Sequence, residues 1–319
     1  MPKRNHFISQ LAHLEIYSPK LEESVKFFHD ILGLEESGRL GNSVYMRAWG
    51  EFFHHSLKIT EGPTHGLGHI GWRAESEEDL LEAVEFIESK GYGKGWIDGD
   101  LGHGRAYQFV SPEGHLEEIF WDVDLAVIPE EKQSKWRSRP QKNPSRGASV
   151  RRLDHVTLWS SDVTRHNQYY QELGFKYNEG VVLPNGTEVG SILAVSSLNH
   201  EVAMFADYSK QNGNLNHICY AVENRDQVLE TADYVVDNGY RLEMKPFKHA
   251  LGEAFTTYAI EPGGNRVEIY GGSPLYFAPD YGPKLWPVAE NPNDAWSEHN
   301  IFMDSSEFDS VHEKHSVKK

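Results

Sequence analysis

The chain repeats itself with a period of roughly 145 residues, and this repeat limits the possible folds more than any other feature. Residues 11–17 (LAHLEIY) return as residues 153–159 (LDHVTLW), and residues 66–72 (GLGHIGW) return as residues 214–220 (NLNHICY). All of these segments have strand-like composition and precede an amphipathic helical pattern. Because solenoid repeats have shorter periods, the repeat predicts two related domains.

Helices are predicted over residues 21–32, 77–90, 163–173 and 225–238, and Gly33 ends the first of them. The residues that we expect to face the core are Val25, Phe28 and Leu32 in the first, Leu80, Leu81, Val84 and Ile87 in the second, and Leu229, Ala232, Val235 and Val236 in the fourth. Several further strands follow each helix. The expected fold class is α+β.

The predicted domains are a first module, residues 1–149, and a second module, residues 150–319. The first ends in a polar, basic, proline-containing linker from about residue 128, which could instead pack along the surface through Trp136. In the second module, residues 272–296 are rich in Pro, Gly and aromatic residues, which indicates a packed covering tail. Residues 305–319 are expected to be mobile.

Each module ends in a predicted β-hairpin with a carboxylate in its returning strand. In the second module residues 256–260 and 267–270 are strand-like and the EPGG sequence between them favours a turn, which places Glu268 within the returning strand. Glu118 takes the equivalent place in the first module. A carboxylate on a packed strand face needs a partner or a metal ion, whereas one on an edge strand is simply solvated. The hairpin alone leaves both readings open.

Composition narrows the class of partner. A net charge of −17 argues against binding to nucleic acid or to an anionic membrane surface, and no apolar run is long enough for a membrane span. The single cysteine, Cys219, excludes an intrachain disulfide framework and a thiolate metal cluster. The amino-terminal residues do not resemble a signal peptide. We therefore expect a cytoplasmic protein that acts on a small molecule.

Histidine is abundant, with 17 residues, and its positions follow the repeat. In each module the first strand and a middle strand carry one histidine each, and the last strand carries the glutamate. The resulting sets are His13, His69 and Glu118, then His155, His217 and Glu268. Two imidazoles and one carboxylate form the facial triad of non-heme Fe(II) oxygenases. A single histidine is more often a half-buried structural residue, but the repeated set favours metal binding.

A longer motif carries a family resemblance. From His249 through Tyr258 to Glu268 the sequence has the pattern H-x8-YAIEPGGNRVE, and LDH and LNH precede it at residues 153–155 and 215–217. This pattern resembles the two-domain extradiol ring-cleavage dioxygenases of the catechol 2,3-dioxygenase type, in the vicinal oxygen chelate superfamily. The resemblance covers roughly residues 8–290. It implies a βαβββ unit used four times and paired into two modules.

The resemblance also implies roles for particular residues. His155, His217 and Glu268 would bind Fe(II), with Mn(II) as an alternative. His200 would be the acid/base residue, and His249 and Tyr258 would donate hydrogen bonds to the diol. The implied reaction is the cleavage of a catechol by dioxygen to a 2-hydroxymuconic semialdehyde-type product, and the implied assembly is a homotetramer.

The first module lacks part of this set. Gln108 occupies the place of Tyr258, His54 and His55 lie near the place of His200, and His103 is a candidate counterpart of His249. We interpret the first module as non-catalytic, with His13, His69 and Glu118 hydrogen-bonded together. Metal binding by that set is the alternative.

The substrate class follows from missing arginines. Relatives that accept carboxylate-bearing catechols have arginines at residues 244–248 (MKPFK) and 293–296 (NDAW), where this chain has none. Catechol or an alkyl- or chloro-catechol is predicted, in a pocket walled by Trp159, Phe247 and aromatic residues of the tail. Lys245 and Lys248 leave homoprotocatechuate as an alternative. Alternatives of another class are a glyoxalase-type metal isomerase and a drug-sequestering binding module.

Overall fold

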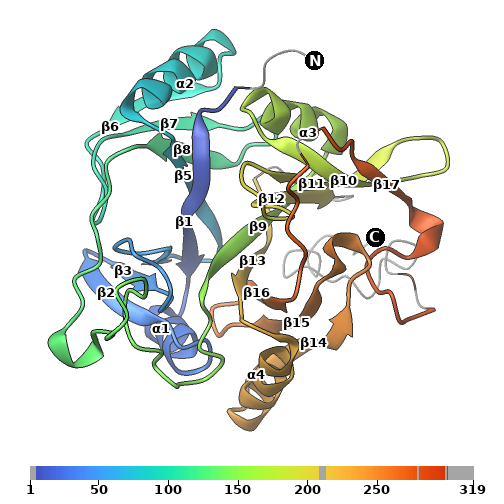
Figure 1. The fold of residues 1–319 in the computed structure, drawn as a ribbon. Coiled ribbons are helices and arrows are strands. Elements are labelled where there is room, and N and C mark those ends of the chain that lie inside the picture. The colour runs from blue at the N-terminus through green and yellow to red at the C-terminus, as the bar shows by residue number, and fades with distance from the viewer. Residues whose placement is uncertain (1–4, 208–212, 279, 299, 301–319) are drawn as a thin grey trace.

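The computed structural model describes residues 5–207, 213–278, 280–298 and 300. Two large sheets make up the molecule, one from each half of the chain. Figure 1 shows β1 (Ile8–Ser18) and β9 (Arg152–Ser160) passing through the middle of the molecule, while the helices lie at its outside. The expected mobility of residues 305–319 concerns a segment outside the described residues.

The first sheet has the strand order β2-β3-β4-β1-β5-β8-β7-β6. Besides β1, its elements are α1 (Leu21–Asp30), β2 (Glu35–Leu40), β3 (Ser43–Arg47), β4 (Leu57–Glu61), β5 (Gly66–Ala74), α2 (Glu77–Ser89), β6 (Gly93–Ile97), β7 (Ala106–Val110) and β8 (Leu116–Phe120). Each run of strand, helix and further strands is one βαβββ unit, so this half contains two units.

The second sheet has the order β14-β15-β16-β13-β9-β12-β11-β10-β17. Besides β9, its elements are α3 (Val163–Glu172), β10 (Lys176–Val182), β11 (Glu188–Ala194), β12 (Val202–Ala206), β13 (Leu215–Ala221), α4 (Arg225–Asp237), β14 (Arg241–Lys248), β15 (Phe255–Ile260), β16 (Arg266–Gly271) and β17 (Lys284–Pro287). This half also has two βαβββ units, followed by the extra strand β17. The predicted α+β fold with a fourfold βαβββ unit is confirmed.

The two sheets place their histidines and glutamates on neighbouring strands. Strands β1, β5 and β8 are consecutive in the first sheet, and β9, β13 and β16 are consecutive in the second. Glu268 lies on an interior strand and is 2% exposed, while its neighbours Val267 and Ile269 face the hydrophobic core. The solvated edge-strand reading of the hairpin is therefore wrong.

The helices form where the sequence predicts them, but the predicted core faces need correction. The Ser76 and Asn224 side chains accept hydrogen bonds from backbone N–H groups in the first turns of α2 and α4. Leu81, Leu229 and Val236 were expected inside, yet they are 52%, 49% and 56% exposed. The buried stripes are Leu80, Ala83, Val84 and Ile87 in α2 and Val228, Thr231, Ala232 and Val235 in α4. Spacings of three, four and seven residues select these positions, so the small and polar residues Ala83 and Thr231 take core places.

The segment between the two halves and the tail after β16 both pack against the sheets. In the first of these, Gln141 is buried and accepts a hydrogen bond from Arg47, and Arg146 bonds Glu35. The expected anchor, Trp136, is instead 62% exposed. In the tail, β17 pairs in parallel with β10. None of the described helices is both long enough and apolar enough to cross a membrane.

A buried carboxyl group joins the two halves. Glu117 of β8 accepts hydrogen bonds from the Trp72 indole N–H and from the Tyr169 hydroxyl of α3. Complete burial outweighs these hydrogen bonds and raises the pKa of Glu117 to about 7. This carboxyl group is therefore more easily ionised in the unfolded chain than in the folded one.

Glu117→Gln is expected to change how stability depends on pH. Since the folded pKa lies above the ordinary value of 4.5, the wild type loses stability as pH rises through the interval from 4.5 to about 7, whereas the amide does not titrate. Melting temperatures of both proteins, measured from about pH 5 to about pH 8, should show the wild type falling relative to the variant. A difference between the two melting temperatures that stays constant over this range would contradict the assignment.

Candidate active site

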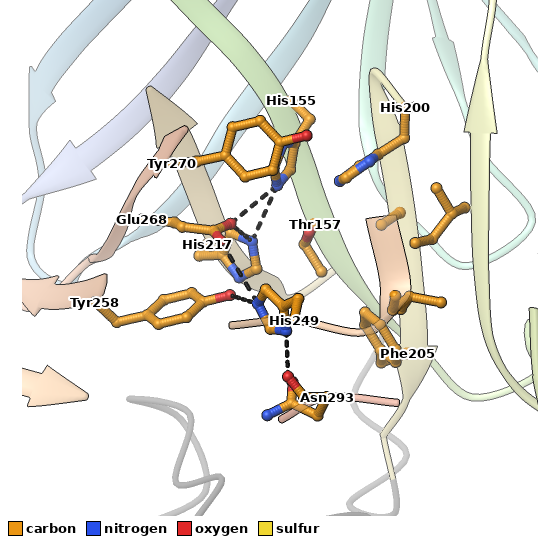
Figure 2. A pocket seen from close by; sticks show the side chains of 13 residues that line it. His155, Thr157, His200, Phe205, His217, His249, Tyr258, Glu268, Tyr270 and Asn293 are labelled. Atoms are coloured by element: carbon orange, nitrogen blue, oxygen red, sulfur yellow. Dashed lines mark hydrogen bonds and ion pairs between the residues drawn. The ribbon is translucent and has the colours of Figure 1, made fainter. Parts of the chain in front are cut away.

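Three side chains of the second sheet converge on one point. The Nε2 atoms of His155 and His217 each lie 3.0 Å from Oε2 of Glu268 and 3.4 Å from one another. They belong to the consecutive strands β9, β13 and β16, and all are buried. Figure 2 shows the three groups on one side of a cavity, with His200 and Phe205 across from them.

The residue before each histidine fixes its ring. Nδ1 of His155 donates to Oδ2 of Asp154 at 2.9 Å, and Nδ1 of His217 donates to Oδ1 of Asn216 at 2.8 Å. The guanidinium group of Arg266 donates to the same Asn216 oxygen at 3.3 Å, so this oxygen is an acceptor. With Nδ1 as the donor in both neutral rings, both Nε2 atoms present a lone pair toward Glu268.

The two oxygen atoms of the Glu268 carboxylate make different contacts. Oε1 accepts a hydrogen bond from the Thr256 hydroxyl at 2.5 Å, and Oε2 faces the two imidazoles. Although burial alone would raise its pKa, the adjacent imidazole groups of His155 and His217 hold the pKa of Glu268 well below its ordinary value. Two imidazole lone pairs and one ionised carboxylate therefore meet at one place. This donor set fits a divalent transition-metal ion.

His200 lies beside the three converging groups, with its ring centroid 3.8 Å from that of His155. Its Nδ1 donates to Oδ1 of Asn199 at 2.7 Å, and Nδ2 of Asn199 donates to the Glu179 carboxylate at 2.8 Å. Because a carboxylate only accepts, Glu179 fixes the orientation of the Asn199 amide and thereby the tautomer of His200. Burial and the neighbouring His155 hold the pKa of His200 well below its ordinary value. Nε2 of this ring is thus a free base that lines the cavity.

The tail contacts the same carboxylate. Tyr276 donates its hydroxyl to Glu179 at 2.7 Å, and the indole N–H of Trp286 donates to it at 2.8 Å. The backbone N–H of Gly252 donates as well, at 3.1 Å. Packing of the tail therefore supports the group that orients His200.

His249 and Tyr258 form a hydrogen-bonded pair at the edge of the site. Nδ1 of His249 donates to the backbone carbonyl of Asn293, so Nε2 accepts from the Tyr258 hydroxyl at 3.1 Å. Burial and the nearby Glu268 raise the pKa of Tyr258 well above its ordinary value, so the hydroxyl keeps its proton. The ring of Phe247 packs against both, with centroid distances of 4.8 Å to His249 and 6.1 Å to Tyr258.

The cavity brings together every predicted site residue of the second module. Its lining comprises His155, Thr157, Ile192, His200, Ala203, Phe205, His217, His249, Leu251, Tyr258, Glu268, Tyr270 and Asn293. The predicted walls Trp159 and Phe247 are not part of it, and Asn293 is the residue that the described part of the tail contributes, with no aromatic residue among that part of the lining. Phe247 instead packs against the rings of His249 and Tyr258 without lining the cavity.

No lysine or arginine belongs to the described lining. Arg266 is buried behind Tyr258, with its guanidinium group 4.9 Å from the ring centroid, and bonds Glu243. The Lys248 ammonium group donates to the backbone carbonyl of Glu253. The cavity therefore offers apolar walls and neutral polar groups around the convergent triad.

Several residues that contribute to the site were not singled out from the sequence. Asp154, Asn199 and Asn216 each come immediately before a site histidine, and this shared spacing was a usable signal. Thr157 and Tyr270 lie on strands already predicted, and Phe205 lies on β12, whose bounds were not predicted. Nothing in their composition set the three residues apart. Asn293 reaches the cavity only because the tail folds back over β14.

The first module has a similar arrangement. Gln108 pairs with Glu118 across β7 and β8 as Tyr258 pairs with Glu268 across β15 and β16, so Gln108 occupies the expected place. His13 and His69 are hydrogen-bonded through their Nε2 atoms at 2.8 Å, and His103 approaches Glu118 to 3.3 Å. The predicted contact among the first-module residues is present.

Comparison with known proteins agrees with this fold and site. Residues 10–119 and 152–269 both match the Glyoxalase/Bleomycin resistance protein/Dioxygenase superfamily. A metapyrocatechase from Geobacillus stearothermophilus is 43% identical over 293 residues, covering 91% of this chain and 89% of that protein. A manganese-dependent 2,3-dihydroxybiphenyl 1,2-dioxygenase from Geobacillus genomosp. 3 is 35% identical over 88% of this chain and 90% of its own. The crystal structure of the 2,3-dioxygenase LapB from Pseudomonas sp. KL28 superposes with a TM-score of 0.81 at 26% identity, covering 89% and 98% of the two chains.

The chain belongs to the Glyoxalase/Bleomycin resistance protein/Dioxygenase superfamily. Within that superfamily it falls among the two-domain extradiol dioxygenases of the metapyrocatechase, or catechol 2,3-dioxygenase, type. The resemblance stated from the sequence is confirmed.

Proposed function

We propose that the protein cleaves catechol, or an alkyl- or chloro-catechol, with dioxygen next to the diol, giving a 2-hydroxymuconic semialdehyde-type product. Residues 150–319 form the catalytic module in this proposal, and residues 1–149 form a non-catalytic one. The observation that carries it is the convergence of His155, His217 and Glu268 beside a neutral His200, with one side open to an apolar cavity.

The proposed cofactor is Fe(II), held by His155, His217 and Glu268, with Mn(II) as the alternative. Both ions accept imidazole and carboxylate ligands, and one relative of this chain is named for its manganese dependence. Such an ion, when bound, supplies chelation of the diol oxygens and one-electron chemistry toward dioxygen. All other contributions come from side chains of the protein.

The proton balance assigns a role to His200. Ring cleavage by dioxygen adds both oxygen atoms and needs no external reductant, so a proton taken from the diol must return to the product. Nε2 of His200 carries a lone pair because Nδ1 donates to Asn199. The ring therefore accepts the proton from the diol and later donates it, which general acid–base catalysis requires of one group near the reacting atoms.

Tyr258 and His249 hold the diol from its other side. The Tyr258 hydroxyl keeps its proton and bonds Nε2 of His249 before substrate arrives. A substrate oxygen that replaces this contact receives a directed hydrogen bond, which stabilises negative charge as it develops. The apolar side chains of Ile192, Phe205 and Leu251 exclude water from the ring.

Two other functions of this superfamily fit less well. A glyoxalase-type isomerase would draw its ligands from both modules, whereas the ligands here come from one sheet. A drug-sequestering module would need no convergent triad. The pairing of the triad with His200, His249 and Tyr258 favours ring cleavage.

The expected substrate preference follows from the charge of the cavity. With no cation among the described lining residues, catechol and 3-methylcatechol should exceed homoprotocatechuate in kcat/KM by more than about tenfold. Oxygen uptake by the Fe(II)-loaded protein, measured with each diol, checks both the activity and the preference. A preference of that size for homoprotocatechuate would mean that the site binds the substrate carboxylate. It would overturn the assignment of catechol or an alkyl- or chloro-catechol as the substrate.

The assembly is proposed from the family resemblance to be a homotetramer. Leu81, Leu229 and Val236 leave apolar surface on the outer faces of α2 and α4 that further subunits can cover. The proposed location is the cytoplasm, and the proposed partners are the catechol and dioxygen.

A further inference from the structure

The turn between β15 and β16 lies against the first module. These two strands form the hairpin that carries Tyr258 and Glu268, called the catalytic hairpin below. The proposed reaction uses none of the turn residues 261–265 (EPGGN), and none of them belongs to the described cavity lining. Glu261 and Asn265 are nevertheless 1% and 2% exposed, so the turn places buried polar groups between the modules.

The Glu261 carboxylate binds the turn to the first module. Its Oε2 atom accepts a hydrogen bond from the Ser24 hydroxyl of α1 at 2.5 Å, and the Ser18 hydroxyl lies 2.7 Å from that of Ser24. The same carboxylate accepts from the backbone N–H groups of Gly263 and Asn265 at 2.7 and 2.8 Å. One buried carboxylate therefore both shapes the turn and connects it to α1.

Asn265 adds two hydrogen bonds between the modules. Its Nδ2 atom donates to the backbone carbonyl of Tyr17 at 2.9 Å, and its Oδ1 atom accepts from the backbone N–H of Gly66 at 3.0 Å. Because a carbonyl only accepts and an N–H only donates, these contacts fix the orientation of the amide. The ends of β1 and β5 thus hold the turn from the side opposite to α1.

Gly263 and Gly264 allow this close approach. A Cβ atom on Gly263 would lie 2.2 Å from Oγ of Ser18, and one on Gly264 would lie 2.7 Å from Nδ1 of His65. Gly264 also has a φ of +115°, whereas Gly263 does not adopt a left-handed φ. Contact with the first module, rather than the conformation of the turn, therefore requires glycine at position 263.

The residue after the turn connects it to a further part of the site. The guanidinium group of Arg266 is 4.9 Å from the ring centroid of Tyr258. It also donates to Oδ1 of Asn216, the oxygen that accepts from Nδ1 of His217. A displacement of the turn would therefore move Tyr258 and Glu268 and would also disturb the group that orients His217.

We propose that the first module positions the catalytic hairpin, with Glu261 and Asn265 as the positioning residues for Tyr258 and Glu268. The inference rests on the proposed function, in which these two side chains contact the diol and the metal ion. A misplacement of about 1 Å can cost about a hundredfold in rate, so a buried contact that fixes the hairpin end supports turnover. The first module thereby contributes to the rate although none of its residues belongs to the described cavity lining.

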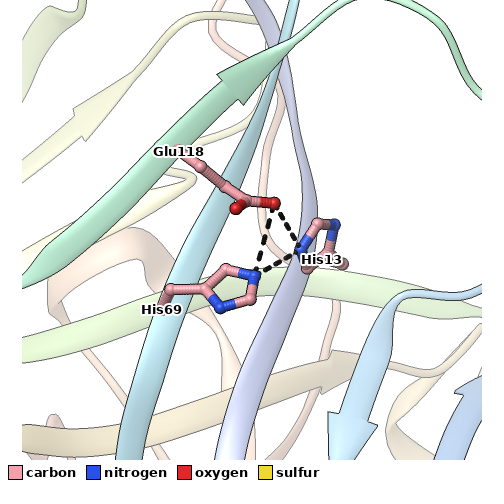
Figure 3. Close-up of side chains that lie close together, drawn as sticks. All are labelled: His13, His69 and Glu118. Atoms are coloured by element: carbon pink, nitrogen blue, oxygen red, sulfur yellow. Dashed lines mark hydrogen bonds and ion pairs between the residues drawn. The ribbon is translucent and has the colours of Figure 1, made fainter. Parts of the chain in front are cut away.

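The hairpin of the first module makes the reverse contact and supplies a matched control. Oε2 of Glu113, in the turn between β7 and β8, accepts from the backbone N–H and the hydroxyl of Ser161 at 2.6 and 2.7 Å. Glu113 is itself 2% exposed. Glu118 of the same hairpin points toward His13 and His69 (Figure 3) and does not line the cavity. Loss of the Glu113 contact therefore weakens the same pair of modules without moving the catalytic hairpin.

Two alanine variants compare these contacts. Glu261→Ala should weaken Co²⁺ binding and lower kcat for catechol, each by about tenfold or more, because the catalytic hairpin loses its fixed position. Glu113→Ala should also lower the melting temperature but should keep Co²⁺ affinity and kcat near the wild-type values. Titration of Co²⁺ against a chelator, steady-state kinetics of the Fe(II)-loaded proteins and thermal unfolding measure these effects.

Removal of single hydroxyl groups gives a second comparison if Glu261→Ala does not fold by circular dichroism. Ser24→Ala removes the donor to Glu261 and should lower Co²⁺ affinity and kcat by about threefold or more. Ser161→Ala removes the corresponding donor to Glu113 and should change neither quantity.

Two results would overturn the positioning role. One is wild-type Co²⁺ affinity and kcat in Glu261→Ala or Ser24→Ala. The other is an equal loss in both members of a pair, which would show only that the modules have loosened. The Co²⁺ comparison does not need turnover, so a wild type that binds Co²⁺ without cleaving catechol would contradict the proposed function, and the Co²⁺ affinities of the variants would still decide the positioning role.

Discussion

His217→Ala is expected to abolish ring cleavage, lowering kcat/KM for catechol by at least about a thousandfold. The substitution removes one of the two imidazoles that face Oε2 of Glu268 and leaves two ligand groups at the site. Two ligands hold Fe(II) poorly, and without the ion the diol is not chelated. Oxygen uptake with catechol and the iron content of the purified variant measure the two effects together.

His29→Ala is the matched control for this experiment. His29 lies on α1, and its imidazole contacts Asp30 rather than the site. The control should keep both its iron and its activity. Iron content and turnover that survive in His217→Ala would show that the second-module triad is not the catalytic centre.

His200→Gln is expected to separate metal binding from turnover. The imidazole supplies an acceptor and donor of protons beside the diol, so kcat should fall by about 10²–10⁴-fold. Since His200 is not one of the converging ligands, the iron content and the KM for catechol should change little. Steady-state kinetics and elemental analysis of the same preparation test this split.

Two outcomes would contradict the role of His200. A kcat close to that of the wild type would show that no proton passes through this ring. A loss of iron in proportion to the loss of turnover would make His200 a residue of the metal site rather than an acid/base residue.

One difference between the two modules lies beside their carboxylates, where Tyr258 of the second corresponds to Gln108 of the first. In the second, the Tyr258 hydroxyl occupies Nε2 of His249, which stays 3.7 Å from Glu268. In the first, Gln108 makes only a 3.5 Å contact with Glu118, and Nε2 of His103 stays without a hydrogen bond. The tyrosine therefore pairs with the histidine in the second module, whereas His103 has no such partner among the described residues.

The internal sequence repeat predicted most of the fold. Period-two strands around His13, His69, His155 and His217 placed these residues on equivalent strands, and the turn at residues 261–264 placed Glu268 within a returning strand. That Glu268 faces inward follows from its burial in the structure. The family resemblance supplied the βαβββ unit and its pairing into two modules, but the order of the strands in each sheet comes from the structure. The predicted buried faces of the helices were wrong at Leu81, Leu229 and Val236. Leucine and valine are apolar at any position, but burial depends on the angular position of a residue around the helix axis.

The surroundings of the site were less predictable than its ligands. Glu179 bonds Asn199, and Tyr276 and Trp286 reach Glu179 only after the tail has folded over β10. No sequence spacing encodes these contacts. The cavity walls were misassigned for a similar reason. Trp159 and Phe247 are large and near the motif residues, yet the orientation of each side chain depends on tertiary packing.

The most direct test of the proposed function is the fate of labelled dioxygen. Fe(II)-loaded protein and catechol should react under ¹⁸O₂ to a yellow ring-opened semialdehyde that carries both labelled atoms, apart from exchange of the aldehyde oxygen with water. Mass spectrometry of the freshly quenched product measures this label. An unreacted catechol, a product opened between the two hydroxyl groups, or a semialdehyde without label would contradict extradiol cleavage at the His155, His217 and Glu268 site.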